Sequence, residues 1–222
     1  MQISKKTFEV LKNFSQINAN LYVEAGNSIK TIAVAKNIMG EVAIDEVFPS
    51  NFGIYNLPEL LGVLSMMNNP DLTFEKDYIL IQEGKSKMRY VYSDPSILTY
   101  PEKSIKLSSV DVQLNMTAVQ INQLQKAAAA IGVQDIAIVG DGKSIVAQVV
   151  DKKNSTSNLY TVDLDTPTDL KFKVFFKTEY WKQITDDYSV EICKKNICKF
   201  TGKNHGVTYF VACEKDSEFE IM

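Results

Sequence analysis

Few residues in this chain have the types and spacing that catalysis needs. The 222 residues include one histidine, His205, which lies in a stretch typical of a turn and has no evident serine or cysteine partner. The segment Gly140-Asp141-Gly142-Lys143 lies between two predicted strands, so a hairpin turn explains its glycines better than a phosphate-binding loop does. We therefore predict no catalytic residues.

Acidic residues occur mainly as neighbours along the chain. Asp45-Glu46 and Asp186-Asp187 are examples, and consecutive side chains do not converge on one substrate. We interpret these pairs as parts of solvated turns or helix ends. Carboxylates that are distant in sequence can still meet in the fold, so a small metal-dependent nucleic-acid enzyme stays open as an alternative.

The three cysteines are Cys193, Cys198 and Cys213. An odd number without a secretion signal argues against a disulfide framework. We expect Cys193 and Cys198 to face each other as half-buried thiols across a hairpin that turns at Lys195-Asn196. With one histidine, the chain lacks the convergent ligands of a zinc site, so we predict no metal and no cofactor.

Composition indicates a globular protein. Hydrophobic residues make up 45% and charged residues 23%, which allows a sizeable core. No apolar run approaches the roughly 20 residues that span a bilayer, and the N-terminal residues do not resemble a signal peptide. We expect a cytoplasmic protein without membrane contact. The net charge of −3 argues against a surface that is basic throughout, but a single basic face stays possible.

Hydrophobic periodicity predicts an α+β fold whose two halves share one order of elements. Each half shows a helix, three strands, a strand that leads into a second helix, and three more strands. The predicted helices cover residues 4–18, a segment from Leu57, residues 115–131 and a segment from Lys177 that bears Tyr180, Trp181, Ile184 and Tyr188. The segment 52–60 matches 172–180 at an offset of 120. A single α+β domain is the competing interpretation.

We predict a first domain at residues 1–94, an extended connector at 95–104 and a second domain at 105–222. Two prolines, Pro95 and Pro101, bracket the connector, which lacks helical periodicity. The loosely alternating residues 105–114 should form the first strand of the second domain. The C-terminal tail, residues 214–222, is acidic and we expect it to fray.

Two predicted helices carry lysines on their polar sides. Lys5 and Lys12 point within about 20° of each other, away from the apolar side, and Glu9 is the one acid in that helix. Lys126 lies on the polar side of the helix at 115–131, and no acid occurs between Asp111 and Asp135. Such faces suit phosphate contacts that carry no sequence information, although lysines on a helix are often only a solvated face.

Two stretches resemble a known family. Residues 11–18, Leu-Lys-Asn-Phe-Ser-Gln-Ile-Asn, and residues 54–65, Ile-Tyr-Asn-Leu-Pro-Glu-Leu-Leu-Gly-Val-Leu-Ser, are similar to the first two helices of the DNA polymerase sliding clamp of T-even-type bacteriophages, a member of the PCNA-like family. The second half matches by pattern only. The resemblance implies two clamp-type domains per chain, each with two helices on antiparallel sheet, assembled into a head-to-tail homotrimeric ring.

The function implied by the resemblance is that of a non-enzymatic processivity factor. The ring would encircle double-stranded DNA without reading its sequence and tether the replicative DNA polymerase. The implied partners also include an ATP-dependent clamp loader and the sigma-like and co-activator proteins of late transcription. A ring can be acidic overall while lysines line its channel, and the channel candidates here are Lys5, Lys12 and Lys126, with Lys6 and Lys182 behind them.

The resemblance places two further sites. An apolar pocket for partner peptides would involve Met39, Val42, Leu98, Tyr100, Phe210 and Ala212, any of which could also be plain core. Subunit joints would pair edge strands near residues 87–92 and 158–164. The residues expected in those joints are Lys87, Met88, Tyr90, Tyr92, Leu159, Tyr160 and Val162.

Three alternatives remain from the residues alone. One is a monomeric DNA-binding processivity factor of the same fold, which oligomeric state would distinguish. Another is the metal-dependent enzyme already named, and the last is a hub that binds only protein.

Overall fold

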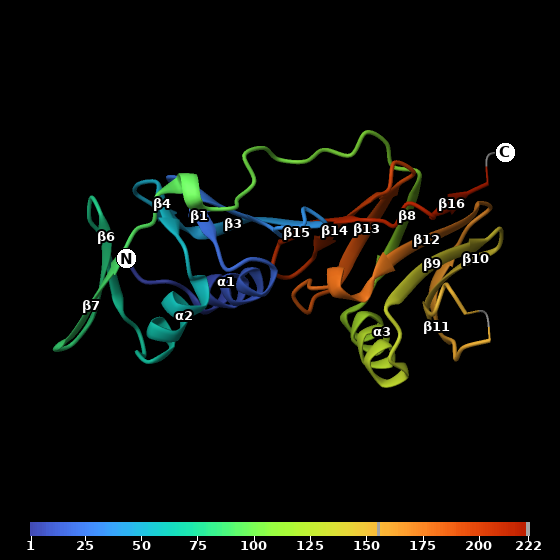
Figure 1. Ribbon diagram of the computed structural model, residues 1–222, viewed down its shortest axis with the longest axis horizontal. Coiled ribbons are helices and arrows are strands. Elements are labelled where there is room, and N and C mark those ends of the chain that lie inside the picture. Colours follow the sequence, from blue (N-terminus) through green and yellow to red (C-terminus); the bar gives the residue numbers. More distant parts are fainter. Residues whose placement is uncertain (155, 221–222) are drawn as a thin grey trace. The chain divides into compact units, whose positions relative to one another are not determined.

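The computed structural model describes residues 1–154 and 156–220 as two compact units (Figure 1). The first unit comprises Met1–Ser104 together with His205–Val207. The second comprises Ile105–Asn204 and the chain from Thr208 onward. The boundaries predicted from the sequence, with a separate connector at 95–104, stay a prediction. In the structure the connector segment begins with a single 3-10 turn, η1 (Pro95–Ile97).

The first unit holds two helices that lie side by side, α1 (Lys5–Ile17) and α2 (Leu57–Ser65) (Figure 1). Ser4 caps α1 by accepting a hydrogen bond from the Thr7 amide, and Asn56 caps α2 in the same way through Glu59. Four residues of α2, Leu57, Leu60, Leu61 and Leu64, are buried, as are Val10 and Phe14 of α1. The helical periodicity of apolar residues therefore predicts both helices. For α1 the predicted range, 4–18, differs from the observed one by one residue at each end.

The strands of the first unit are antiparallel. Four hydrogen bond in the order β4-β1-β2-β3, and three more form a separate sheet in the order β5-β6-β7. Their bounds are β1 (Leu21–Val23), β2 (Gly26–Ile32), β3 (Ile38–Phe48), β4 (Phe52–Ile54), β5 (Asp71–Phe74), β6 (Tyr78–Glu83) and β7 (Ser86–Val91). Ile29, Ile38 and Met39 bury their side chains completely or nearly so, which fixes the register of the β2–β3 pair.

The second unit repeats much of this order around one helix, α3 (Ala118–Ile131). A capping box between Thr117 and Gln120 starts α3, and Gly132 ends it in the left-handed conformation, φ 76°. The strands are β8 (Val112–Met116), β9 (Asp135–Asp141), β10 (Ser144–Val150), β11 (Tyr160–Pro167), β12 (Lys171–Lys177), β13 (Tyr188–Cys193), β14 (Ile197–Gly202), β15 (Thr208–Ala212) and β16 (Glu218–Phe219). One sheet has the order β11-β10-β9-β12-β16, and β15-β14-β13-β8 are hydrogen bonded in that order.

The prediction of a helix that starts at Lys177 is wrong. The segment forms one 3-10 turn, η2 (Thr178–Tyr180), and is irregular from Trp181 until β13 begins at Tyr188. Trp181 and Tyr188 are buried without a helix, and the Trp181 ring packs edge-on against Phe176 and Phe200, at centroid distances of 5.8 and 5.9 Å. The described residues of the second unit therefore form one α-helix where two were expected.

Two smaller predictions also fail. Residues 105–111 are irregular, and the strand expected at 105–114 starts at Val112, because pairing with β13 begins there, opposite Ile192. Cys193 does not face Cys198: the register of β13 and β14 places Cys193 opposite Ile197. The Cys198 thiol instead lies 3.5 Å from the Cys213 thiol, and all three cysteines are free and buried.

Candidate functional site

The outer face of α1 carries three exposed lysines, Lys5, Lys6 and Lys12. Lys5 makes an ion pair with Glu9 at 3.9 Å, and their side chains are 92% and 44% exposed. An ion pair so open to solvent holds its charges weakly, so the lysines stay available to an anion. Asn13, which the sequence places on this polar side, is buried instead.

The outer face of α3 is polar and lacks acids. Lys126 is exposed, as are Asn122 and Gln123, and Lys126 is the one charged residue between Ala118 and Ile131. The opposite side of the helix buries Ile121, Leu124 and Ala128. A single positive charge on a face of amides and alanines can attract a phosphate backbone without a specific readout.

Lys182 does not lie on a helix. It follows η2 in the irregular segment and is half-buried. The prediction that Lys182 lies on the face of a helix is therefore wrong. A groove of about 330 Å³ lies beside α3 in this region, lined by Ala128, Ala129, Val133 and Ile136 among others. The α2 face adds little positive charge either, because its exposed charged residue is Glu59.

The residues predicted for the peptide pocket differ in how much surface they offer. Met39 and Val42 on β3 are buried, with 1% and 5% exposure, and Phe210 on β15 is 4% exposed. Leu98, Tyr100 and Ala212 are half-buried. The first three are thus core side chains within their own units, and the second three retain accessible surface. Their common site stays a prediction.

The connector near Leu98 is attached to the first unit by specific hydrogen bonds. The Asn18 side-chain amide donates to the Thr99 carbonyl at 2.9 Å, and the Thr99 amide donates to the Asn20 side chain at 3.1 Å. The Tyr100 ring lies against Tyr22, with centroids 4.6 Å apart. These contacts fix residues 98–100 against β1, so the half-buried Leu98 and Tyr100 form a pre-positioned surface.

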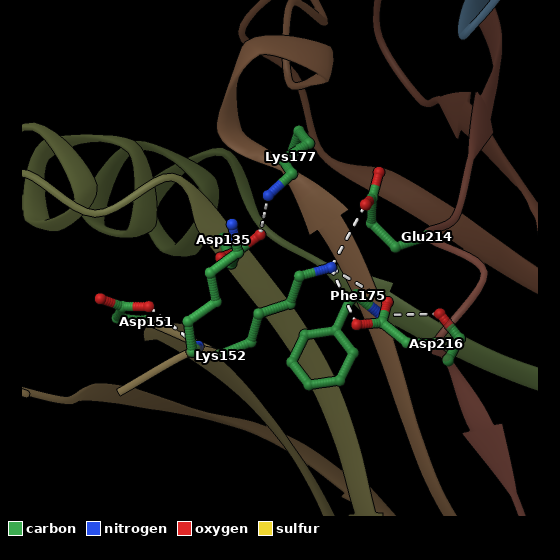
Figure 2. Close-up of polar contacts among 9 residues, drawn as sticks. Asp135, Asp151, Lys152, Phe175, Lys177, Glu214 and Asp216 are labelled. Carbon is green, nitrogen blue, oxygen red and sulfur yellow. Dashed lines mark hydrogen bonds and ion pairs between the residues drawn. The ribbon is translucent and has the colours of Figure 1, made fainter. Parts of the chain in front are cut away.

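The C-terminal segment is ordered through residue 220 and does not fray as predicted there; residues 221–222 lie outside the described part. Its strand β16 pairs with β12, and Phe219 stacks on Phe172. Figure 2 shows the Lys152 amine held between Glu214 and Asp216, at 3.2 and 2.9 Å, over the Phe175 ring. Beside it Lys177 pairs with Asp135 (Figure 2). Lys152 therefore fastens the tail to the sheet.

The strands predicted to join subunits both lie at sheet edges. β7 ends the three-stranded sheet and β11 ends the five-stranded sheet. Lys87 is exposed and Met88 half-buried, whereas Tyr90 is buried and its hydroxyl donates to the Asn56 carbonyl at 3.1 Å. Tyr92 stacks on Phe52, and burial together with nearby Glu75 raises the pKa of its hydroxyl to about 12.

On β11 the side chains are more open. Tyr160 is 37% exposed and Val162 is half-buried, and Leu159, which immediately precedes the strand, is 55% exposed. Sequence reasoning omitted three exposed residues of these edges, Arg89, Val91 and Asp163. The period-2 alternation of the strands is the signal that would have found them, because it separates the outward side chains from those that pack inward.

Within the described residues, no group of three or more histidine, cysteine or acidic side chains is placed to hold a metal ion. No helix there combines the length and the apolar character that crossing a membrane requires. Burial next to Cys213 raises the pKa of the Cys198 thiol, which opposes its ionisation.

Comparison with known proteins gives one consistent family. A model described as DNA polymerase processivity factor matches residues 4–100, and one described as gp45 sliding clamp, C terminal, matches residues 113–215. The sliding clamp of Vibrio phage KVP40 is 28% identical, over 96% of this chain and 99% of its own. The sliding clamp of Enterobacteria phage T4 is 28% identical over the full length of both chains.

Solved structures agree at the level of the fold. The proliferating cell nuclear antigen of Entamoeba histolytica superposes with a TM-score of 0.72 at 14% identity, over 93% of this chain and 94% of that one. The two family models together span about nine-tenths of the sequence, one in each unit. The chain therefore belongs to the DNA polymerase processivity factors, as a sliding clamp of the type that T4-like phages encode.

Proposed function

We propose that copies of this chain assemble head to tail into a homotrimeric ring that encircles duplex DNA and tethers the replicative DNA polymerase. Family membership supports the clamp function, and the full-length match to phage clamps supports it for both units. In this function the protein catalyses nothing. It prevents the polymerase from dissociating because a closed ring cannot leave DNA sideways.

The observation that carries the proposal is the distribution of charge. The chain has a net charge of −3, yet the outer face of α1 bears Lys5, Lys6 and Lys12, and α3 bears Lys126 without an acid. In a ring whose helices face the channel, these lysines would meet the phosphates while most acids lie elsewhere. A few exposed lysines bind phosphates weakly, and weak contacts permit sliding.

The partners follow from the same proposal. A closed ring needs an ATP-dependent loader to open it, and polymerase would dock through a short peptide. The pocket residues with surface for that peptide are Leu98, Tyr100 and Ala212, which are half-buried. In the proposed organisation Leu98 and Tyr100 belong to the connector at 95–104, between a first domain at 1–94 and a second at 105–222 that contains Ala212. We further propose that sigma-like and co-activator proteins of late transcription use the same clamp, in the cytoplasm of the host cell.

Solution mass tests the ring directly. Light scattering over a concentration series should give a mass near three times 24.9 kDa at high concentration, with dissociation on dilution. A mass of one chain at every concentration would contradict the ring and favour a monomeric processivity factor of the same fold. DNA binding that required Mg²⁺ and ended in strand cleavage would instead support a metal-dependent enzyme.

A further inference from the structure

Two buried thiols lie in contact on one face of a sheet in the second unit. The Sγ atoms of Cys198 and Cys213 are 3.5 Å apart, and the two residues are 0% and 8% exposed. Cys198 belongs to β14, and Cys213 directly follows β15. Val211 lies opposite Cys198 and two residues before Cys213, so strand alternation points both thiols to the same side. The pairing of β14 with β15 therefore brings the two sulfur atoms together.

The third cysteine is placed differently. Cys193 lies opposite Ile197, and its sulfur atom lies 3.3 and 3.5 Å from the hydroxyl oxygens of Ser109 and Ser108. Burial raises the pKa of this thiol, but its hydrogen bonds, first of all the one from Ser109, outweigh burial and lower the pKa to about 7. Because its contacts are hydroxyl groups, Cys193 serves as an internal control for the thiol pair.

Cys213 lies at the root of the C-terminal tail. Its amide donates to the Asn196 carbonyl at 2.9 Å, beside the start of β14, and the next amide, that of Glu214, donates to the Phe175 carbonyl at 2.8 Å. The chain therefore passes at this point from one sheet to β12 of the other. From there the ion pairs of Lys152 hold the tail. A covalent bond at Cys213 would fix the point where the tail leaves β15.

We propose that Cys198 and Cys213 are a redox-active pair, which hydrogen peroxide converts into a disulfide that fastens the root of the tail to β14. Cys213 keeps a small exposed surface, so the oxidant reaches its sulfur atom first, and the fully buried Cys198 is the resolving thiol. A disulfide bond is about 2.05 Å long, so sulfur atoms that start 3.5 Å apart must approach by about 1.5 Å. Because Cys213 lies beyond the last residue of β15, a small shift there provides this approach.

The reaction balances with peroxide as the oxidant. The Cys213 sulfur attacks one oxygen of hydrogen peroxide, the O–O bond breaks, and the thiol proton leaves with the other oxygen as water. The Cys198 sulfur then attacks the sulfur of the Cys213 sulfenic acid. The S–S bond forms as the S–O bond breaks, and the released hydroxide takes the Cys198 proton to give a second water. Burial raises the pKa of Cys198, so this proton leaves only as the S–S bond forms.

Buried thiols also serve simply as small apolar side chains that fill a core. That simpler role predicts no linked product. Peroxide would then leave both thiols reduced, or it would oxidise Cys213 beyond the sulfenic acid because no second thiol intercepts it. The product at Cys213 therefore distinguishes the two explanations.

Peptide mapping of the full-length protein after peroxide treatment tests the pair. Trypsin cleavage after lysine places the three cysteines on three separate peptides. Peroxide is removed with catalase, free thiols are alkylated in urea, and the digest is run without reductant. We expect the Cys198 and Cys213 peptides to be linked and the Cys193 peptide to be alkylated. Dithiothreitol should separate the linked pair.

Two variants sharpen this experiment. In Cys198→Ala, dimedone should label the Cys213 sulfenic acid, which wild type should not accumulate because Cys198 resolves it. Cys193→Ala, the matched control, should link Cys198 to Cys213 as efficiently as wild type does. Absence of the linked peptide from wild type, or equal dimedone labelling in wild type and Cys198→Ala, would overturn the proposal.

Amide exchange of residues 213–220 measures the effect on the tail, and this readout depends on neither assembly nor DNA. Oxidation should slow exchange at Cys213 and Glu214 by about tenfold, because the bond restricts local opening at the root of the tail. It should also lower the unfolding equilibrium constant by roughly tenfold to a hundredfold, seen as a higher urea midpoint. Dithiothreitol should reverse both changes, and Cys198→Ala should show neither. Linked protein with the exchange rates and urea midpoint of the reduced protein would refute the proposed role of the bond.

Discussion

Removal of three lysines from the helix faces should reduce the salt dependence of DNA binding. The variant K5A/K12A/K126A loses positive charge from α1 and α3, where all three side chains are exposed. None of the three fills the core, and the Lys5–Glu9 ion pair is too exposed to support the fold. The expected effect is therefore on DNA and not on folding or assembly.

The size of the effect follows from counterion release. Each lysine that contacts a phosphate contributes about 0.9 to the slope of log K against log salt concentration. Loss of one such contact changes the response between 50 and 200 mM salt by about 3.5-fold. Even if only one lysine of the set contacts DNA at a time, the slope should fall by about one unit, and more if several copies contribute.

Fluorescence anisotropy of a labelled duplex, titrated at several salt concentrations, measures this slope. The control variant K76A/K103A/K153A removes the same charge from three exposed lysines that lie outside the helices. We expect the control to retain the wild-type slope. Equal slopes for wild type and K5A/K12A/K126A, with the fold intact, would remove these lysines from the DNA contact.

Three further predictions concern the tail and the connector. Lys152→Ala should release the C-terminal segment, so amides of β16 should exchange with solvent faster while those of β10 keep their protection. The hydrogen bond from Lys152 is the chief cause that lowers the pKa of Asp216. Attachment of the tail should therefore be complete above the ordinary aspartate pKa, and it should be lost as the pH falls through the lowered pKa of Asp216. Amide exchange of β16 measured over this pH range tests the prediction. Gly53→Ala would push a methyl group into the Ser93 carbonyl and the Leu98 side chain, which should cost about 1–3 kcal/mol of stability in urea unfolding. Gly62→Ala, with open space on α2, is its control and should not destabilise the protein.

Local signals in the sequence predicted much of the fold. Ser4 and Asn56 cap the helices whose apolar periodicity is plain, and α1 and α2 begin where those residues predict. The start of α3 was placed three residues early, at Asn115 instead of Ala118. The capping box of Thr117 and Gln120 was the signal that would have corrected it.

The segment after Lys177 shows why the rest could not be predicted. Trp181, Ile184 and Tyr188 have helical spacing, but contacts distant in sequence decide their conformation. The Ile184 amide donates a hydrogen bond to the Tyr209 hydroxyl, and the Trp181 ring packs edge-on against Phe200. A pattern of burial identifies which side chains are inside; it does not show whether a helix or an irregular segment puts them there.

The candidate site was predicted unevenly for the same reason. Lys5, Lys12 and Lys126 follow from helical periodicity alone and are exposed as expected. The edge positions of β7 and β11 depend on sheet order, which long-range pairing determines, and came from the family resemblance. Their outward residues Arg89 and Asp163 were omitted, although the period-2 alternation within each strand indicates them.

Topological attachment to DNA tests the central claim most directly. The protein is incubated with nicked circular plasmid, closed with a short amine cross-linker, washed in high salt to screen phosphate contacts, and separated by gel filtration. A ring around DNA should stay with the circle and leave after a restriction enzyme linearises the plasmid. Equal retention on circular and linear DNA, or loss from both despite efficient cross-linking into trimers, would contradict the account.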